Sequence, residues 1–350
     1  MNQLIKYIGL MVTIVIFAFA IETTMRRTTE KKPWRIPPKR WVPMYKGRVR
    51  NDRSIFVSIA SYRDTDCLKT VKELFEKADR PQRLFVGVCQ QNKHHNETCA
   101  DPSFPFSDHV RMMHLDHEEA RGPCYARYLC SSLWQGENFF FQIDSHTKFD
   151  PHWDTTLINM WESIEDPKAV LGHYPAEYEK RGNGKVPVNC RGEMQANGII
   201  RMAATELDPF ETPVKTYWAG ANFLFGHGKM IQDVPFDPDL DMLFHGEELL
   251  YSARLYTHGY DIYAPNVNVS YHYYGRKEQP KFWNDVPDRN LYKAMQAQSE
   301  ETVKRILGLQ RNVSHNGAYG LGKQRDLRSF WNDTGVDFNA PQTINRCSSL

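Results

Sequence analysis

The sequence has little excess of charge of either sign and no paired metal-binding cysteines. Lysine and arginine give 44 positive charges against 42 negative ones, so the formal net charge is only +2. Nucleic-acid binding draws on clustered positive charge, and no long basic segment interleaved with aromatic residues occurs, so we expect no nucleic-acid partner. The seven cysteines contain no Cys-x-x-Cys pair, which argues against a zinc ribbon.

Long apolar runs are also scarce, with one exception at the start of the chain. Residues 7–21, YIGLMVTIVIFAFAI, are uncharged and are flanked by basic residues. Their length is near the lower limit of a membrane span, which needs ~17–25 residues. Two interpretations stay open. We favour an uncleaved signal anchor that comprises residues 1–21, because a basic, proline-rich stem follows in residues 22–50. The alternative is a signal peptide that is cleaved after residues 18–20.

Four glycosylation sequons favour a lumenal or extracellular position for the rest of the chain. The seven cysteines are compatible with two or three disulfides and at least one free thiol, as expected in such a compartment. We predict one folded domain over 51–310 and a C-terminal tail over 311–350. The sequons are Asn96-Glu-Thr98, Asn268-Val-Ser270, Asn312-Val-Ser314 and Asn332-Asp-Thr334.

The folded region opens with a strand-helix-strand unit of a parallel sheet. Buried-strand patterns occupy 54–60 and 83–89, and residues 67–78 between them carry apolar side chains at helical spacing. Parallel sheets bind ligands beyond the carboxyl ends of their strands, so the turn after the first strand is either a nucleotide contact or an ordinary capped turn. The residues of that turn are Ser61, Tyr62, Arg63 and Asp64.

The most informative stretch is an aromatic-rich strand pattern over 138–143 that is followed by Asp144, Ser145 and His146. Alternate residues that leave a strand project to one side, so Asp144 and His146 can offer a carboxylate oxygen and an imidazole nitrogen to one divalent ion. This ligand set suits Mn²⁺ or Zn²⁺ better than Ca²⁺. Because Asp-x-His also occurs by chance, a plain turn at a strand end is the alternative.

Two other stretches contain candidate binding residues. Arg121 and Arg127 lie near the start of a predicted helix, where they would either meet a diphosphate or form surface ion pairs. Trp218 and Gly220 belong to a predicted strand over 217–225, in which small residues beside an aromatic indicate close approach of the backbone to a ligand. Residues 177–189 are polar and read as a loop.

Two acidic residues and a later histidine complete the set of candidates. Glu247 and Glu248 begin a predicted helix, where they would either complement its dipole or place one carboxylate near a hydroxylated ligand. Residues 262–276 read as one alternating strand that contains His272 and Arg276. A lone histidine in such a strand is more often structural than functional.

Four of these stretches together resemble the polypeptide α-N-acetylglucosaminyltransferases. That family transfers GlcNAc from UDP-GlcNAc to hydroxyproline or threonine in proteins, and it is similar to the mucin-type polypeptide GalNAc-transferases. The resemblance covers residues 52–310 and implies an α/β fold of the GT-A type, with a mixed, mostly parallel sheet and flanking helices. The matching motifs are 55–64 (IFVSIASYRD), 120–127 (ARGPCYAR), 142–146 (QIDSH) and 218–223 (WAGANF).

The resemblance also implies roles for the candidate residues. Glu247 and Glu248 would be catalytic, standing where the GalNAc-transferases have the last two residues of Gly-Gly-Glu-Asn. The sequence here is His-Gly-Glu-Glu, which leaves open which glutamate contacts the sugar or acceptor. The implied Mn²⁺ ligands are Asp144, His146 and His272. The implied contacts to UDP-GlcNAc are Ser61, Tyr62, Arg63, Asp64, Arg121, Arg127, Trp218, Gly220 and Arg276.

The implied activity is retaining, Mn²⁺-dependent transfer of GlcNAc to a threonine, serine or hydroxyproline hydroxyl of a protein acceptor. No carboxylate pair suited to a covalent glycosyl intermediate is evident in the sequence. With the anchor, we expect a single-pass type II Golgi glycoprotein whose catalytic domain is lumenal. The alternatives are a catalytically inactive lumenal sugar- or peptide-binding protein of the same fold, or a transferase that uses UDP-GalNAc or UDP-Glc.

Overall fold

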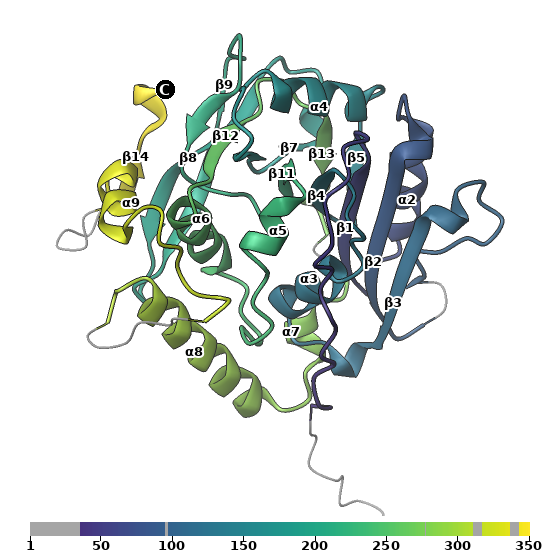
Figure 1. The fold of residues 1–350 in the computed structure, drawn as a ribbon. Coiled ribbons are helices and arrows are strands. Elements are labelled where there is room, and N and C mark those ends of the chain that lie inside the picture. Colours follow the sequence, from purple (N-terminus) through teal and green to yellow (C-terminus); the bar gives the residue numbers. More distant parts are fainter. Residues whose placement is uncertain (1–35, 95–96, 277, 311–316, 337–342) are drawn as a thin grey trace, which may run out of the picture. The chain divides into compact units, whose positions relative to one another are not determined.

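The computed structural model describes residues 36–94, 97–276, 278–310, 317–336 and 343–350 (Figure 1). The chain divides into two compact units, Met1–Pro38 and Lys39–Leu350. The predicted anchor over 1–21 and the first part of the stem lie outside the described residues, as do the sequon asparagines Asn96 and Asn312. Within the described ranges, no helix is long and apolar enough to cross a membrane.

A mixed sheet forms the centre of the unit Lys39–Leu350, in the order β10-β12-β6-β11-β4-β1-β2-β3. Among the described residues, six of its eight strands run in one direction and only β10 and β11 oppose them. This confirms the predicted mixed, mostly parallel α/β fold. The strands are β1 (Ile55–Tyr62), β2 (Leu84–Asn92), β3 (Val110–Asp116), β4 (Phe139–Asp144), β6 (Ala169–Gly172), β10 (Val214–Thr216), β11 (Phe223–His227) and β12 (Asp261–Ala264).

Helices cover both faces of this sheet, so β4 is buried on both sides, and its first three residues are phenylalanines. Phe139 and Phe141 pack in one core cluster, with α2 (Cys67–Glu76) and α4 (Trp153–Glu162). Phe140 points the other way, into a cluster with α3 (Pro123–Ser131), α5 (Lys229–Asp233) and α6 (Glu247–Thr257). The predicted strand-helix-strand start is confirmed, because β1 and β2 pair in parallel and α2 lies between them in the chain.

The predicted single strand over 262–276 is wrong, because the chain there forms two strands in different sheets. β12 ends at Ala264, directly before Pro265, which has no amide hydrogen to continue a ladder. The chain then enters β13 (Ser270–His272), which pairs with β5 (Thr147–Phe149) and β7 (Ala176–Glu177) in a small second sheet. This pairing carries His272 to the region of the chain that follows β4.

The polar stretch 177–189 is only partly a loop, because β8 (Val186–Met194) begins within it. β8 forms a third sheet with β9 (Ile200–Leu207) and β14 (Thr343–Asn345). The C-terminal region adds α7 (Phe282–Asp285), α8 (Arg289–Ile306) and α9 (Leu327–Thr334). Residues 317–336 and 343–350 therefore belong to the folded unit, whereas we predicted a tail from residue 311.

The folded unit also starts earlier than the predicted boundary at residue 51. Val42, Met44, Tyr45 and Val49, which we assigned to the stem, pack against the core cluster on the α3 face. The Arg40 amide donates to the Tyr125 hydroxyl at 2.6 Å. Burial of these apolar side chains ties the last part of the predicted stem to the domain.

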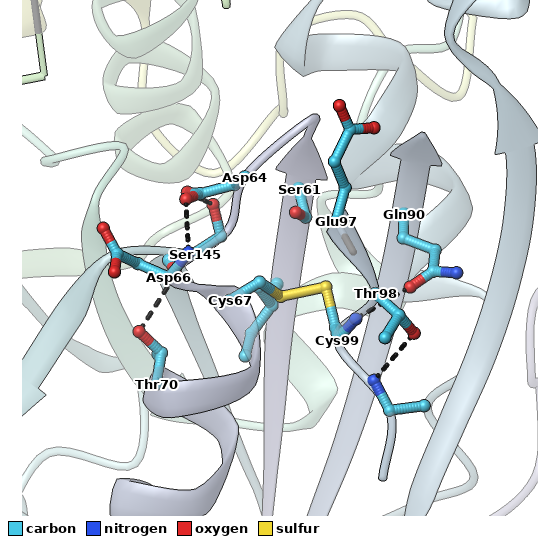
Figure 2. Close-up of a disulfide and its surroundings, with 12 residues drawn as sticks. Ser61, Asp64, Asp66, Cys67, Thr70, Gln90, Glu97, Thr98, Cys99 and Ser145 are labelled. Carbon is cyan, nitrogen blue, oxygen red and sulfur yellow. Dashed lines mark hydrogen bonds between the residues drawn. A yellow bond between two sulfur atoms is a disulfide. The ribbon is translucent and has the colours of Figure 1, made fainter. Parts of the chain in front are cut away.

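All seven cysteines lie in the described ranges, and they form two disulfides, Cys67–Cys99 and Cys190–Cys347. Figure 2 shows the first, which joins the start of α2 to the segment after β2. The second ties the C-terminal end to β8. Two disulfides and buried free thiols agree with the cysteine prediction, the free residues being Cys89, Cys124 and Cys130.

Candidate metal centre and surrounding cavity

Three side chains that can bind a metal meet beyond the carboxyl end of β4. Asp144 is the last residue of β4, His146 lies in the following turn, and His272 is the last residue of β13. Each offers one ligand atom, and these atoms all lie within 4.8 Å of one another. His272 Nε2 is 3.0 Å from Asp144 Oδ2. One carboxylate and two imidazoles, converging in a partly buried site, fit a divalent transition metal.

Strand pairing explains this convergence. β13 runs antiparallel to β5 with His272 opposite Thr147, the residue that follows His146. Thr70 of α2 donates from its hydroxyl to the carbonyl oxygens of Ser145 and Thr147, at 2.9 and 3.0 Å, and so holds the turn that bears His146. The ligands are therefore supplied by two sheets and held by a helix behind them.

Protonation states in this cluster favour metal binding, since ligands must be deprotonated. Burial opposes the charge of Asp144, but the hydrogen bond and charge of His272, aided by His146 and Arg127, hold the pKa of Asp144 below its ordinary value. Burial lowers the pKa of His146 although Asp64 opposes that shift. The site thus contains a carboxylate and a neutral imidazole.

The cluster opens into a cavity of ≈ 630 Å³, a size typical of small-molecule sites. Its lining contains the cationic side chains Arg127, Arg276 and Lys281 as well as the acidic Glu247 and Glu248. Nη2 of Arg276 forms an ion pair with Asp64 Oδ2 at 3.2 Å, and the buried Nε has no hydrogen-bond partner among the described residues. A guanidinium group in a cavity wall is suited to an anionic ligand such as a diphosphate.

Glu247 and Glu248 occupy the first turn of α6 and both line the cavity. Glu247 forms an ion pair with Arg127 and accepts a hydrogen bond from the Cys124 thiol at 2.8 Å. Glu248 accepts from the Ala221 amide at 2.8 Å and from the Tyr174 hydroxyl. Gly246, which caps the helix with φ +102°, adopts a conformation that L side chains rarely take.

The two carboxyl groups differ in electrostatic setting. Arg127 balances the charge of Glu247. Burial raises the pKa of Glu248 to about 7, and the charge of Glu247 adds to this effect while the Tyr174 hydrogen bond opposes it. A carboxyl group with such a pKa can exchange a proton near neutral pH.

Among the predicted donor contacts of the first turn, only Tyr62 lines the cavity, and its hydroxyl donates to Asp285 at 2.8 Å. Ser61 is fully buried, with its carbonyl oxygen accepting from Gln91. The Arg63 side chain is held by ion pairs with Glu97 and Asp285, at 3.1 and 2.6 Å. The structure therefore turns most of this segment away from the cavity.

Asp64 of the same turn lies behind His146 and is fully buried. Its Oδ2 accepts from the Ser145 hydroxyl at 2.5 Å and lies 2.9 Å from His146 Nδ1. Burial opposes the charge of Asp64, but its hydrogen bond to His146 and the charges of Arg276 and His146 hold its pKa below the ordinary value. An ionised carboxylate only accepts hydrogen bonds, so His146 Nδ1 carries the proton and Nε2 is free for a metal.

The other predicted contacts divide between cavity and core. Arg127 and Arg276 line the cavity. Arg121 instead pairs with Asp241 at 3.3 Å. Trp218 is buried in the core cluster beside α6, so it supports the site from behind. A Cβ atom at Gly220 would lie 1.9 Å from the His173 carbonyl oxygen, so the glycine permits close approach of two chain segments and not of a ligand.

Some cavity residues carried no signal in the sequence. Tyr174 and Lys281 lie outside every motif, and only the fold brings them to the cavity. Tyr274 could have been found from the aromatic run after His272, and its ring centroid lies 4.1 Å from that of His272. Cys124 lies inside the 120–127 motif, but its contact with Glu247 depends on the packing of α3 against α6.

Comparison with known proteins assigns the family. The model of the family described as "Glycosyltransferase (GlcNAc)" matches residues 54–105 and 101–340. The chain belongs to this glycosyltransferase family. Membership implies a nucleotide-sugar donor and an acceptor substrate, and the matched regions contain the Asp144, His146 and His272 cluster. No curated protein matches the sequence.

This glycosyltransferase shares its fold with a protein of known structure. It is similar to GalNAc-T7, whose crystal structure contains UDP, GalNAc and Mn²⁺, with 13% sequence identity, a TM-score of 0.50, and coverage of 81% of this chain and 55% of that chain. It also matches S. aureus TarS 1-349, with 12% identity, a TM-score of 0.42, and coverage of 72% of this chain and 71% of that one. The chain thus spans about half the length of GalNAc-T7, and at such identity the likeness to that protein shows the fold alone.

Proposed function

We propose that this glycosyltransferase is a Mn²⁺-dependent retaining enzyme of the GT-A type that transfers GlcNAc from UDP-GlcNAc to a hydroxyl group of a protein acceptor. The observation that carries the proposal is the convergence of Asp144, His146 and His272 beside Arg276 in one cavity. The description of the family and the resemblance to polypeptide GlcNAc-transferases support the donor sugar. The UDP and Mn²⁺ bound to GalNAc-T7 support the nucleotide and the metal.

Each part of the cavity has a role in this proposal. A Mn²⁺ ion held by the three ligands would neutralise charge on the leaving diphosphate. Arg276, which lines the cavity and is held by Asp64, binds the phosphates. Arg127 fixes the Glu247 carboxylate, which then accepts hydrogen bonds from the sugar or acceptor. Glu248, with a pKa of about 7, exchanges a proton with a hydroxyl group of the bound substrate. The acceptor hydroxyl attacks on the face from which UDP leaves, which gives retention.

The place of the enzyme in the cell is a further part of the proposal and rests on the sequence. The segment 1–21, with its apolar run over 7–21, anchors it as a type II protein of the Golgi membrane, with the domain in the lumen. The acceptor is then a secretory protein, and its modified residue is threonine or serine. Glycosidase digestion of the full chain tests the orientation, since a lumenal domain gains glycans at its sequons and a cytoplasmic one does not.

The catalytic test is a donor and acceptor screen with purified protein. UDP-GlcNAc, UDP-GalNAc and UDP-Glc are incubated with threonine-rich or hydroxyproline-containing peptides and Mn²⁺, and products are identified by mass and by NMR of the anomeric proton. We expect an α-linked GlcNAc product that EDTA and Asp144→Ala abolish and that Asp79→Asn, a surface change outside the cavity, leaves intact.

Three results would contradict the proposal. Transfer that neither EDTA nor Asp144→Ala reduces would exclude the metal site. A β-linked product would exclude retention. Binding of UDP-GlcNAc without any transfer or hydrolysis would indicate the inactive sugar-binding alternative.

A further inference from the structure

We infer that Asp64 is a positioning residue that prepares two binding sites at once, the metal site through His146 and the phosphate site through Arg276. The inference rests on the proposed function, because it assigns the metal and the diphosphate to this cavity. It replaces the nucleotide contact that the resemblance implies for Asp64. It also predicts that the two sites share one support and weaken together when that support is removed.

The contacts of Asp64 leave it little capacity for a ligand. Its Oδ1 accepts from the Asp66 amide at 3.0 Å. Its Oδ2 accepts from Ser145 and from His146 and faces the Arg276 guanidinium at 3.2 Å. Its side chain is 1% exposed. Figure 2 shows Asp64 turned toward Ser145, next to the start of α2. A carboxylate so enclosed acts on its protein neighbours and not on a nucleotide.

The first neighbour, His146, needs one of its two neutral tautomers to bind a metal through Nε2. A carboxylate beside Nδ1 stabilises the tautomer that carries the proton there, and it also fixes the ring orientation. Without Asp64, the proton is free to occupy Nε2, where it blocks coordination. Loss of this carboxylate is therefore expected to weaken metal binding although all three ligands remain.

The second neighbour, Arg276, is a nearly buried cation whose side chain is 10% exposed. A buried guanidinium is costly unless an opposite charge accompanies it, and the Asp64 carboxylate forms an ion pair with Arg276 at 3.2 Å. The pair uses Nη2 and places Arg276 in the cavity wall, while the buried Nε lacks a hydrogen-bond partner among the described residues. Asp64 thus holds a phosphate-binding group in place without using all its donors.

Asp64 is itself held from both sides, as a positioning group must be. The preceding residue, Arg63, donates from its amide to the Gln91 carbonyl at 3.1 Å. The helix that follows is tied at Cys67 to Cys99 by the disulfide in Figure 2. Thr70 of the same helix holds the turn of Ser145 and His146. The carboxylate and its histidine partner are therefore fixed to the same helix.

The test separates the two sites by measuring each ligand alone. Mn²⁺ binding is measured by electron paramagnetic resonance without UDP, and UDP binding by calorimetry in EDTA, for the wild type and for Asp64→Asn, which keeps the size of the side chain. We expect both affinities to fall by about 10-fold or more. His146→Asn is expected to weaken only Mn²⁺ binding, and Arg276→Gln only UDP binding. Asp79→Asn removes the carboxylate of an exposed Asp–His pair and serves as the matched control.

The outcomes distinguish this inference from the proposed function. A wild type that binds neither Mn²⁺ nor UDP would overturn both. A wild type that binds both, with Asp64→Asn equal to it in either affinity, would overturn the inference and leave the function intact. If Asp64→Asn does not fold, ¹⁵N NMR of the histidines in the metal-free wild type decides instead. The inference requires the Nδ1–H tautomer of His146, assigned by comparison with His146→Asn, and the Nε2–H tautomer would overturn it.

Discussion

Two aspartate–histidine pairs show how burial changes what the same two side chains do. Asp79 Oδ1 and His152 Nδ1 lie 2.6 Å apart at the surface, where the His152 side chain is 71% exposed. Asp64 Oδ2 and His146 Nδ1 lie 2.9 Å apart, with His146 only 11% exposed. The shorter contact belongs to the exposed pair. Contact length therefore does not identify the functional pair, whereas enclosure and further partners do.

The pKa values of the two histidines shift in opposite directions. The hydrogen bond and charge of Asp79 raise the pKa of His152, which favours an imidazolium in an ordinary surface ion pair. Burial lowers the pKa of His146 in spite of Asp64, which favours a neutral ring. The surface pair is a salt bridge, and the buried pair prepares a metal ligand.

The largest expected effect comes from making the same substitution in both pairs. His146→Asn is expected to abolish Mn²⁺-dependent transfer, because one of three protein ligands is lost. His152→Asn is expected to leave it unchanged, and asparagine tolerates the φ of +64° at that position. Initial rates at a series of Mn²⁺ concentrations measure both. Equal losses of transfer activity in the two variants would contradict the distinction between the buried and the surface pair.

A second prediction extends the comparison to buried carboxyl groups. Asp64 has Arg276 and His146 beside it and a lowered pKa, whereas Glu248 accepts from an amide and a hydroxyl group and has a pKa of about 7. If Glu248 must be ionised to accept a proton, kcat/KM rises with pH through about 7 in the wild type. Glu248→Gln is expected to lower kcat/KM by about 100-fold and to remove this rise.

Tyr174→Phe provides the matched variant for this prediction. The Tyr174 hydroxyl donates to Glu248 and opposes the rise of its pKa, so removing the hydroxyl is expected to move the rise in kcat/KM to higher pH. The pH–rate profiles of the three proteins are measured with saturating Mn²⁺. A wild-type profile that the Gln variant reproduces at every pH would exclude a proton-transfer role for Glu248.

Local pattern predicted the parts of the fold and site that depend on a single stretch of chain. The buried strands β1, β2 and β4 and the pair Asp144 and His146 follow from runs of apolar residues and their ends. The position of His272 depends on the pairing of β13 with β5, which no local pattern encodes. The alternation across 262–276 continues through Pro265, and so two strands read as one.

Roles that depend on three-dimensional neighbours were the least predictable. Asp64, Arg63 and Arg121 are polar residues inside the matched motifs, and each could equally face a ligand or another side chain. In the structure, each of these three residues contacts another side chain of the chain itself. The sequence identifies the reactive or charged residues at a strand end. Burial and the pairing of strands and side chains then decide which of them reach the cavity.

The smallest expected effect concerns the stability of the surface pair. The raised pKa of folded His152 means that the pair contributes stability fully below the unfolded value of about 6.5 and loses it as the pH rises through the folded pKa. Asp79→Asn is therefore expected to lower Tm slightly, on the order of 1 °C, at mildly acidic pH and not at alkaline pH. Asp79 stays ionised at mildly acidic pH, because the hydrogen bond from His152 lowers the pKa of Asp79. Calorimetric scans across this range measure it. A drop in Tm that does not depend on pH would mean that Asp79 acts through uncharged hydrogen bonds. The two aspartate–histidine pairs would then differ only in how far they are enclosed, and not in the charge of the histidine.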